Sequence, residues 1–134
     1  MAGTWVFVEQ RDGNIRKVTY EMLSKAKSFG DEVSAVVIGK NVEGLAPEFA
    51  KYGADKVYVV EGDVFANYNT GAYVVQLAAM IKEYSPNAVL FAHTFNGRDL
   101  GSRLAQKLEV GLATDAIGAE ISAGKGVYQS YLCR

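Results

Sequence analysis

The stretch AVLFAHTFNGRDLGSRLAQKL, residues 88–108, decides the fold class of this chain. Its first five residues, 88–92, are uniformly apolar, which is typical of a strand buried on both faces of a parallel sheet. Further on, Leu100, Leu104 and Leu108 lie at i, i+4 and i+8, which is one apolar stripe of an amphipathic helix. We therefore expect a buried strand followed directly by a helix that packs on the sheet.

The same alternation of strand and helix runs through the preceding residues. Short apolar runs predict three further strands, at 5–10, 33–38 and 57–60. Apolar stripes with glycine or proline near their ends predict helices at 17–29, 45–52 and 73–84. Strands that are apolar on both faces and alternate with helices indicate an α/β fold. We predict a parallel, doubly wound sheet with helices on both faces.

The last part of the chain changes in character. Residues 114–122 and 126–132 have the composition of short strands, and residues 123–125 between them indicate a tight turn. We therefore expect the chain to end in a short β-hairpin-like segment. Its length of 134 residues, without internal repeats or low-complexity segments, fits a single domain over 1–134.

The amino-acid composition limits the kinds of partner that the chain is expected to bind. Hydrophobic residues make up 49% and charged residues 22% of the chain, as in an ordinary globular domain. The 14 basic and 15 acidic residues give a net charge of −1, which argues against nucleic acid as a partner. Apolar runs stay far below the ~20 residues that span a bilayer, so we expect no membrane insertion. The single cysteine, Cys133, excludes an internal disulfide and favours the cytoplasm.

The turn before the last helix is the candidate binding site. If Asn96 is the N-cap residue, its side chain accepts from free N–H groups of the first turn. The carboxylate of Asp99 would then lie near the positive end of the helix dipole and stabilise the helix. The functional interpretation places a phosphate or a flavin edge near these N–H groups and Arg98. The alternative is a well-capped helix with a solvated arginine, and the glycine-rich phosphate loops GxGxxG and GxxxxGK[ST] do not occur here.

The sequence predicts neither catalytic machinery nor a metal site. His93 is the only histidine and ends an apolar strand, where a structural hydrogen bond is the commoner role. No second histidine or CxxC pair accompanies it to form a zinc motif. Cys133 has no partner that would activate it as a nucleophile. Glu9 and Asp115 could approach the same rim of the sheet, but no spacing pairs them as acid and base. We therefore expect no enzyme activity from this chain alone.

Several stretches together resemble the electron transfer flavoprotein alpha subunit family. They are TFNGRDLGSRLAQKL at 94–108, GLATD at 111–115, WVFVE at 5–9 and YGADKVY at 52–58. The resemblance runs from about residue 3 to residue 128. It implies an N-terminal α/β domain similar to adenine-nucleotide α-hydrolase and universal-stress domains, followed by a C-terminal FAD-binding domain. It also implies a heterodimer with a beta subunit, which carries electrons between flavin dehydrogenases and an acceptor.

The resemblance implies an electron carrier component and not an enzyme. The sequence ends at Arg134, before the FAD-binding domain would begin, so we expect the N-terminal domain alone. FAD is then the cofactor of the full complex and is not expected to bind tightly here. The matching motif places interface or partner-flavin contacts at Asn96, Gly97, Arg98, Asp99, Thr114 and Asp115.

A different function also fits the α/β pattern. A stand-alone module of universal-stress type would bind AMP or ATP at the rim of the sheet. Such a module would need a glycine-rich loop of the kind GxxGx9G[ST] after the fourth strand. Residues 96–98 and 101–102 match that loop poorly.

For an electron carrier, the sequence identifies neither the dehydrogenase nor the acceptor that it serves. It also does not indicate whether the complex bifurcates electrons.

Overall fold

A computed structural model describes most of the chain. The described residues are 3–11, 14–15, 17–27, 32–65, 69–84, 86, 88–92, 95–108, 111–113 and 126–130. Their strands are β1 (Thr4–Phe7), β2 (Gln10–Arg11), β3 (Asn14–Ile15), β4 (Val33–Gly39), β5 (Lys56–Glu61), β6 (Ala88–Ala92), β7 (Gly111–Ala113) and β8 (Gly126–Ser130). Their helices are α1 (Val18–Lys27), α2 (Ala46–Lys51), α3 (Thr70–Tyr84) and α4 (Phe95–Leu108), with the 3-10 turns η1 (Glu43–Leu45) and η2 (Asp63–Phe65).

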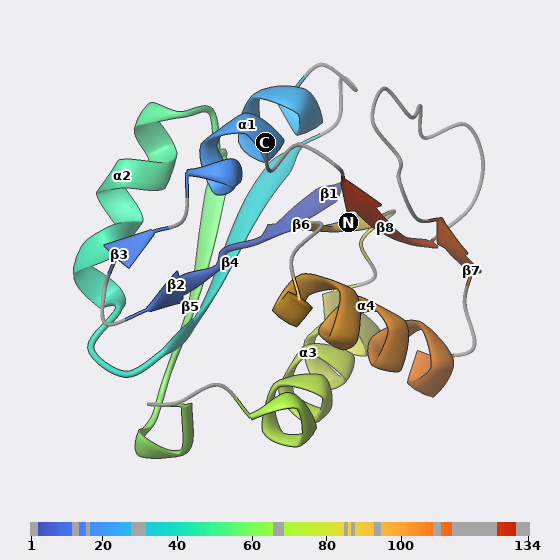
Figure 1. The fold of residues 1–134 in the computed structure, drawn as a ribbon. Helices are drawn as coiled ribbons and strands as arrows, with labels where there is room; N and C mark the ends of the chain where they lie inside the picture. The colour runs from blue at the N-terminus through green and yellow to red at the C-terminus, as the bar shows by residue number, and fades with distance from the viewer. Residues whose placement is uncertain are drawn as a thin grey trace.

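The main sheet of the described residues is parallel throughout. Its strands follow the order β5-β4-β1-β6-β8-β7 (Figure 1). Thr4 of β1 lies opposite Val33 of β4 on one side and Ala88 of β6 on the other. The chain therefore winds outward from β1 in both directions, as the alternating strands and helices predicted. The predicted α/β class with a parallel, doubly wound sheet is confirmed.

Helices cover both faces of this sheet, which is also as predicted. Trp5 and Phe7 of β1 belong to a core cluster with residues of α3 and α4. Val6 and the following Val8 point the other way, into a second cluster with residues of α1 and α2. Figure 1 shows α1 and α2 on one side of the sheet and α3 and α4 on the other. The two-residue period of β1 thus divides the core into two layers.

The ends of the helices follow local sequence signals. Pro47 lies in the first turn of α2, where a missing N–H costs no hydrogen bond. Gly53 follows α2 with φ of 108°, a conformation that an L-residue with a Cβ rarely adopts. Its N–H donates to Ala50 O at 3.3 Å, and the next N–H, of Ala54, donates to Phe49 O at 3.1 Å. This pair of bonds is a Schellman motif, which fixes the end of α2.

Helix α3 begins earlier than its apolar stripe indicated. We predicted a start at Tyr73, but the helix begins at Thr70. Asn69 is the N-cap residue, because its Oδ1 accepts from the Ala72 N–H at 3.1 Å. An asparagine before an apolar run is a recognised start signal, so the sequence did contain the information.

The first predicted strand is divided in two. Its apolar part is β1, and its end, Gln10, belongs to β2. Gln10 pairs with Ile15 and Arg11 with Asn14 in an antiparallel arrangement. Arg11 and Asn14 of the predicted turn-like cluster are therefore paired strand residues, and the two residues between them lie outside the described residues.

The predicted β-hairpin-like ending is wrong. Strands β7 and β8 pair in parallel, with Gly111 opposite Gly126, and β8 also pairs in parallel with β6. Parallel strands cannot be joined by a tight turn and need a connection of about a dozen residues or more. The segment 114–125 provides that length. The strand expected at 114–122 lies outside the described residues.

A carboxylate joins the amino ends of β4 and β5. Asp55 Oδ2 accepts from the Val33 N–H at 2.9 Å, and Lys27 Nζ lies 3.1 Å from Oδ1. The hydrogen bond from the Val33 N–H, followed by that from Lys27, lowers the pKa of Asp55 below its ordinary value of 3.8. Folding therefore favours the ionised form of Asp55.

Acid is expected to remove this stabilisation. Because the pKa of Asp55 is lower in the folded state, its contribution is complete above the unfolded value and is lost as the pH falls through the folded value. We expect Asp55→Asn to be less stable than the parent at pH 7. The difference in free energy of unfolding should shrink below about pH 4. Urea unfolding of both proteins between pH 3 and pH 7 checks this, and a pH-independent difference would contradict it.

Candidate functional site

The candidate site lies at the carboxyl edge of the sheet, between the neighbouring strands β1 and β6, where the direction of the crossovers reverses. From β1, one crossover leads by way of α1 to β4, and the opposite side of β1 is occupied by β6. The connections after β1 and β6 therefore leave the carboxyl edge toward opposite faces, since α1 and α4 lie on different sides. In open α/β sheets, ligands bind in the crevice that such a switch point leaves. Helix α4, with the predicted site residues Asn96, Gly97, Arg98 and Asp99 among its first five positions, follows β6 at this edge.

Glu9 and Gln10 supply polar groups at the end of β1. Glu9 is only 8% exposed, which is unusual for a carboxylate. Gln10 Nε2 donates to Ile38 O at 3.4 Å and lies over Gly39 at the end of β4. A Cβ at Gly39 would stand 2.5 Å from Gln10 Nε2 and 2.8 Å from Val42 Cγ1. The glycine is thus required for Gln10 to close this part of the edge.

The Tyr73 hydroxyl holds the same edge from the side of α3. It lies 3.3 Å from Ile38 O and 3.2 Å from Phe65 O, and its proton can be donated to either carbonyl. Tyr73 is buried, so these carbonyls have a partner where water does not reach. The end of β4, the turn η2 and helix α3 are therefore fixed to one another beside the switch point.

Asp99 connects the beginnings of α3 and α4. Thr70 Oγ1 donates to Asp99 Oδ2 at 2.6 Å, and Arg103 Nε donates to Asp99 Oδ1 at 3.0 Å. The first bond joins residues 29 positions apart in sequence. Asp99 therefore positions the start of α4 against α3. In this geometry its two carboxylate oxygens face protein donors.

The predicted capping role of Asn96 is wrong. Helix α4 begins at Phe95, so Asn96 lies inside its first turn and cannot be the N-cap residue. Asp99 is the fifth residue of the helix, beyond the first turn, where the dipole effect has weakened. The sequence-based start, Gly97 after an Asn96 cap, was two residues late because Asn is also a common residue in turns, and the helix extends back over it. Asn96 and Asp99 are both half-buried.

The structure places only some of the predicted site residues. Asn96 and Asp99 lie together on α4, and the backbones of Gly97 and Arg98 lie between them in the helix. The side chain of Arg98 is outside the described part of the structure. So are all of His93, Thr114, Asp115 and Cys133. Sequence reasoning missed Thr70, Gln10 and Tyr73, whose partners are distant in sequence and carry no local signal.

The described residues provide neither a metal site nor a membrane-spanning helix. No group of three or more His, Cys, Asp or Glu side chains among them could hold a metal ion. None of their helices is both long and apolar enough to cross a membrane.

The described part of this edge fits a flavin or nucleotide poorly. A phosphate site at a switch point typically presents free backbone N–H groups from a glycine-rich turn. Here Gln10 lies over Gly39, and Asp99 brings a carboxylate that is bound to Thr70 and Arg103. A carboxylate repels phosphate. The described residues position a helix start but do not build a cofactor site by themselves.

Comparisons with known proteins agree with one another. A family model described as the electron transfer flavoprotein domain matches residues 4–131. The chain is 82% identical over 128 residues to the electron transfer flavoprotein subunit alpha of Syntrophomonas wolfei, covering 96% of this chain and 40% of that protein. It is 41% identical over 121 residues to the subunit of the same name from Thermoanaerobacterium thermosaccharolyticum, covering 87% and 37%.

A further relative carries a different name. The acryloyl-CoA reductase electron transfer subunit beta of Anaerotignum propionicum is 36% identical over 127 residues, covering 92% of this chain and 35% of that protein. The chain thus spans about two fifths or less of the length of these curated relatives.

Proposed function

Because the chain belongs to the electron transfer flavoprotein family, we propose that it forms the N-terminal α/β domain of an alpha subunit. The complete protein would carry electrons between flavin dehydrogenases and an acceptor, as a carrier and not as an enzyme. The observation that carries this proposal is the family match over 4–131, together with the high identity to a named alpha subunit. The single cysteine in 134 residues supports a reducing compartment, the cytoplasm.

Within this function the domain serves as scaffold and interface. A beta subunit is the partner that the name alpha subunit implies for the relatives. FAD would be held mainly by other parts of the complex, since the described edge of the sheet brings a bonded carboxylate to the switch point. We expect the purified 134-residue chain to show no flavin absorbance spectrum. Tight retention of flavin would contradict this part of the proposal.

The start of α4 is the surface that we assign to the complex. Asn96, Gly97 and Arg98 lie in its first turn, with N–H groups at the positive end of the helix dipole. Asp99 positions that turn through Thr70. We assign partner or partner-flavin contacts to Asn96, Gly97 and Arg98, and to Thr114 and Asp115 on sequence grounds. Such contacts need no catalytic residue in this domain.

A chimeric subunit tests the proposal. The matching 128-residue segment of the Syntrophomonas wolfei alpha subunit is replaced by this chain and produced with that organism's beta subunit. We expect the chimera to form the heterodimer, to contain FAD and to be reduced by the natural electron donor at nearly the parent rate. A chimera that folds but neither pairs nor accepts electrons would overturn the proposal.

The same chimera tests the assigned residues. Arg98→Ala should shift the flavin spectrum or potential, or weaken pairing of the subunits, because a cation near the flavin or the interface is lost. Lys107→Ala on the last turn of α4 is the matched control, since it removes a cation from an exposed position of the same helix. If the two variants have the same flavin spectrum, potential and subunit pairing, Arg98 does not contact the partner or its flavin.

Nucleotide binding is a second candidate function, favoured only by the switch point itself. Calorimetric titration of the chain with AMP and ATP distinguishes it. Micromolar binding would favour the universal-stress type of module over a scaffold domain. The arrangement of Gln10 and Asp99 leads us to expect no such binding.

A further inference from the structure

Three aromatic side chains, the Trp5–Tyr58–Tyr84 cluster, run from the core of the sheet to the surface beside α3. Trp5 of β1 is 3% exposed, and its ring centroid lies 5.2 Å from that of Tyr58 on β5. The ring centroid of Tyr84, at the end of α3, lies 5.0 Å from that of Tyr58 and 6.1 Å from that of Trp5. Tyr84 is 40% exposed. Each ring therefore contacts the other two, and the cluster reaches solvent through Tyr84.

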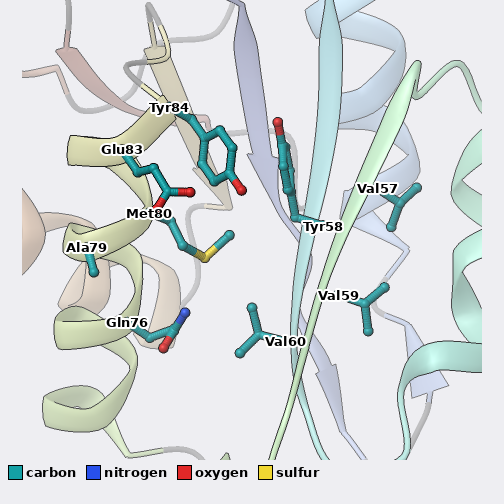
Figure 2. Close-up of a pocket in the computed structure, with 9 residues that line it drawn as sticks. All are labelled: Val57, Tyr58, Val59, Val60, Gln76, Ala79, Met80, Glu83 and Tyr84. Atoms are coloured by element: carbon teal, nitrogen blue, oxygen red, sulfur yellow. The ribbon is translucent and has the colours of Figure 1, made fainter.

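Both tyrosines of the cluster face an open groove. Within the described sheet, β5 pairs with β4 alone, and a groove lies between β5 and α3. Tyr58 and Tyr84 line this groove, and Figure 2 shows their rings facing each other at one end of it. Small solutes can therefore reach the tyrosines, whereas Trp5 is shielded from them.

A carboxylate stands beside the exposed tyrosine. Glu83 also lines the groove, and its hydrogen bond with the Tyr84 hydroxyl raises the pKa of Tyr84 above the ordinary value of 10.0. Tyr84 is thus a neutral phenol at pH 7, and its O–H donates to a group that can accept the proton. A phenol releases its proton when it loses an electron, and a positioned base assists that step. Tyr84 and Glu83 together therefore form a surface electron donor with its own proton acceptor.

We propose that Trp5, Tyr58 and Tyr84 form a relay that carries a one-electron oxidising equivalent from the core to the protein surface. An oxygen-derived oxidant of the hydroxyl-radical class takes one electron from Trp5 and becomes hydroxide, which leaves a tryptophan radical cation. One electron then moves from Tyr84 by way of Tyr58 and restores Trp5. The hydroxyl proton of Tyr84 passes to Glu83, and a neutral tyrosyl radical remains at the surface. A soluble thiol gives that radical a hydrogen atom and becomes a thiyl radical.

The direction of the relay follows from the chemistry of the rings. At neutral pH, a tyrosine that can release its proton is a better electron donor than tryptophan, so the radical moves from Trp5 toward the tyrosines. Phe7 and Phe91 of the same core cluster are much harder to oxidise and cannot hold the radical. The relay thus protects Trp5, whose oxidation would add oxygen inside the core. Because all of its groups lie in this chain, the inference does not depend on the proposed function.

The single tryptophan of the sequence makes the test specific. Light that excites indole but not phenol ejects an electron from Trp5 alone, and a dissolved cobalt(III) ammine complex takes up that electron. Transient absorption of the 134-residue chain then follows both kinds of radical. We expect a tyrosyl radical to appear as the tryptophan radical decays. The double variant Tyr58→Phe/Tyr84→Phe, which keeps both rings and removes only the hydroxyls, should lower the tyrosyl yield at least fivefold.

Tyr52→Phe is the matched control. Tyr52 is 44% exposed, and its ring stacks on Tyr20 and not on Trp5. This variant should match the parent in tyrosyl yield. Glu83→Gln removes the proton acceptor at nearly constant size and should slow the formation of the tyrosyl radical several-fold. Circular dichroism confirms that each variant folds.

Oxidation of Trp5 measures the protection itself. Under hydroxyl radicals from radiolysis, with a soluble thiol present, the double variant should gain oxygen adducts at Trp5 several-fold faster than the parent, as measured by mass spectrometry. A parent without a tyrosyl radical, or a double variant with the parent's yield, would show that the cluster is packing only. An equal loss in Tyr52→Phe would contradict the route through Tyr84. Equal rates of Trp5 oxidation would overturn the protective role. None of these outcomes bears on the proposed function.

Discussion

Leu104→Ala is expected to lower the free energy of unfolding by about 3 kcal/mol, within the 2–5 kcal/mol typical of buried Leu→Ala changes. Leu104 is fully buried in the cluster that α3 and α4 form against the sheet. The substitution removes apolar contacts and leaves a cavity that close-packed neighbours fill only partly. Urea unfolding followed by circular dichroism measures the change. The loss is a large fraction of the stability of a domain of this size.

The control for this prediction lies two residues away. Gln106 is exposed on the same helix, so Gln106→Ala should change the free energy of unfolding by less than about 0.5 kcal/mol. A loss below 1 kcal/mol for Leu104→Ala would mean that α4 is not packed on the sheet as described. The packing that holds the start of α4 in place would then be absent. The assignment of partner contacts to the first turn of α4 would also fall.

Asp99→Ala is expected to cost about 2 kcal/mol, less than the core substitution but more than an ordinary surface change. Hydrogen bonds to charged groups contribute about 1.5–3 kcal/mol, and the short, part-buried bond from Thr70 is of this kind. The pair with Arg103 is an exposed i,i+4 pair, worth about 0.3–0.5 kcal/mol. The bond from Thr70 therefore decides the effect.

A double-mutant cycle separates the two contributions. Asp99→Ala, Thr70→Val and the double variant should give a coupling of about 1 kcal/mol or more in urea unfolding. The cycle of Asp99→Ala with Arg103→Ala should give a coupling of only a few tenths of a kcal/mol. Equal couplings would show that Asp99 is a surface charge and not the connection between α3 and α4.

Particular residues show how far the sequence could predict the fold. The all-apolar run 88–92 identified β6 to the residue. The four-residue spacing from Leu100 to Leu108 identified α4, although the helix begins at Phe95, before the predicted Asn96 cap. The ending was predicted wrongly, because a glycine-containing turn signal at 123–125 says nothing about pairing across the sheet. Direction and order of strands depend on contacts between distant residues, and composition does not encode them locally.

The candidate site was likewise predictable from the sequence only in part. The motif around Asn96 located the start of α4 to within two residues, and the partner contacts that we propose for it come from the family resemblance. The role of Asp99 was not predictable, because Thr70 comes beside it only when α3 and α4 pack together. The exposed apolar positions of α3 were equally hidden. Val75 and Ala79 of α3 carry no local signal of their exposure, and only the structure showed both side chains exposed.

The sequence by itself determined the succession of strands and helices, the layered α/β class and the family. These properties follow from side-chain periodicity and short motifs, which act over a few neighbouring residues. Only the tertiary structure decided the parallel ending, the bond of Thr70 to Asp99 and the uncovered edge of β5 beside α3. The physical reason is that strand order, hydrogen-bond partners and residual exposure depend on which surfaces are buried together, and packing settles this only when the whole sheet has formed.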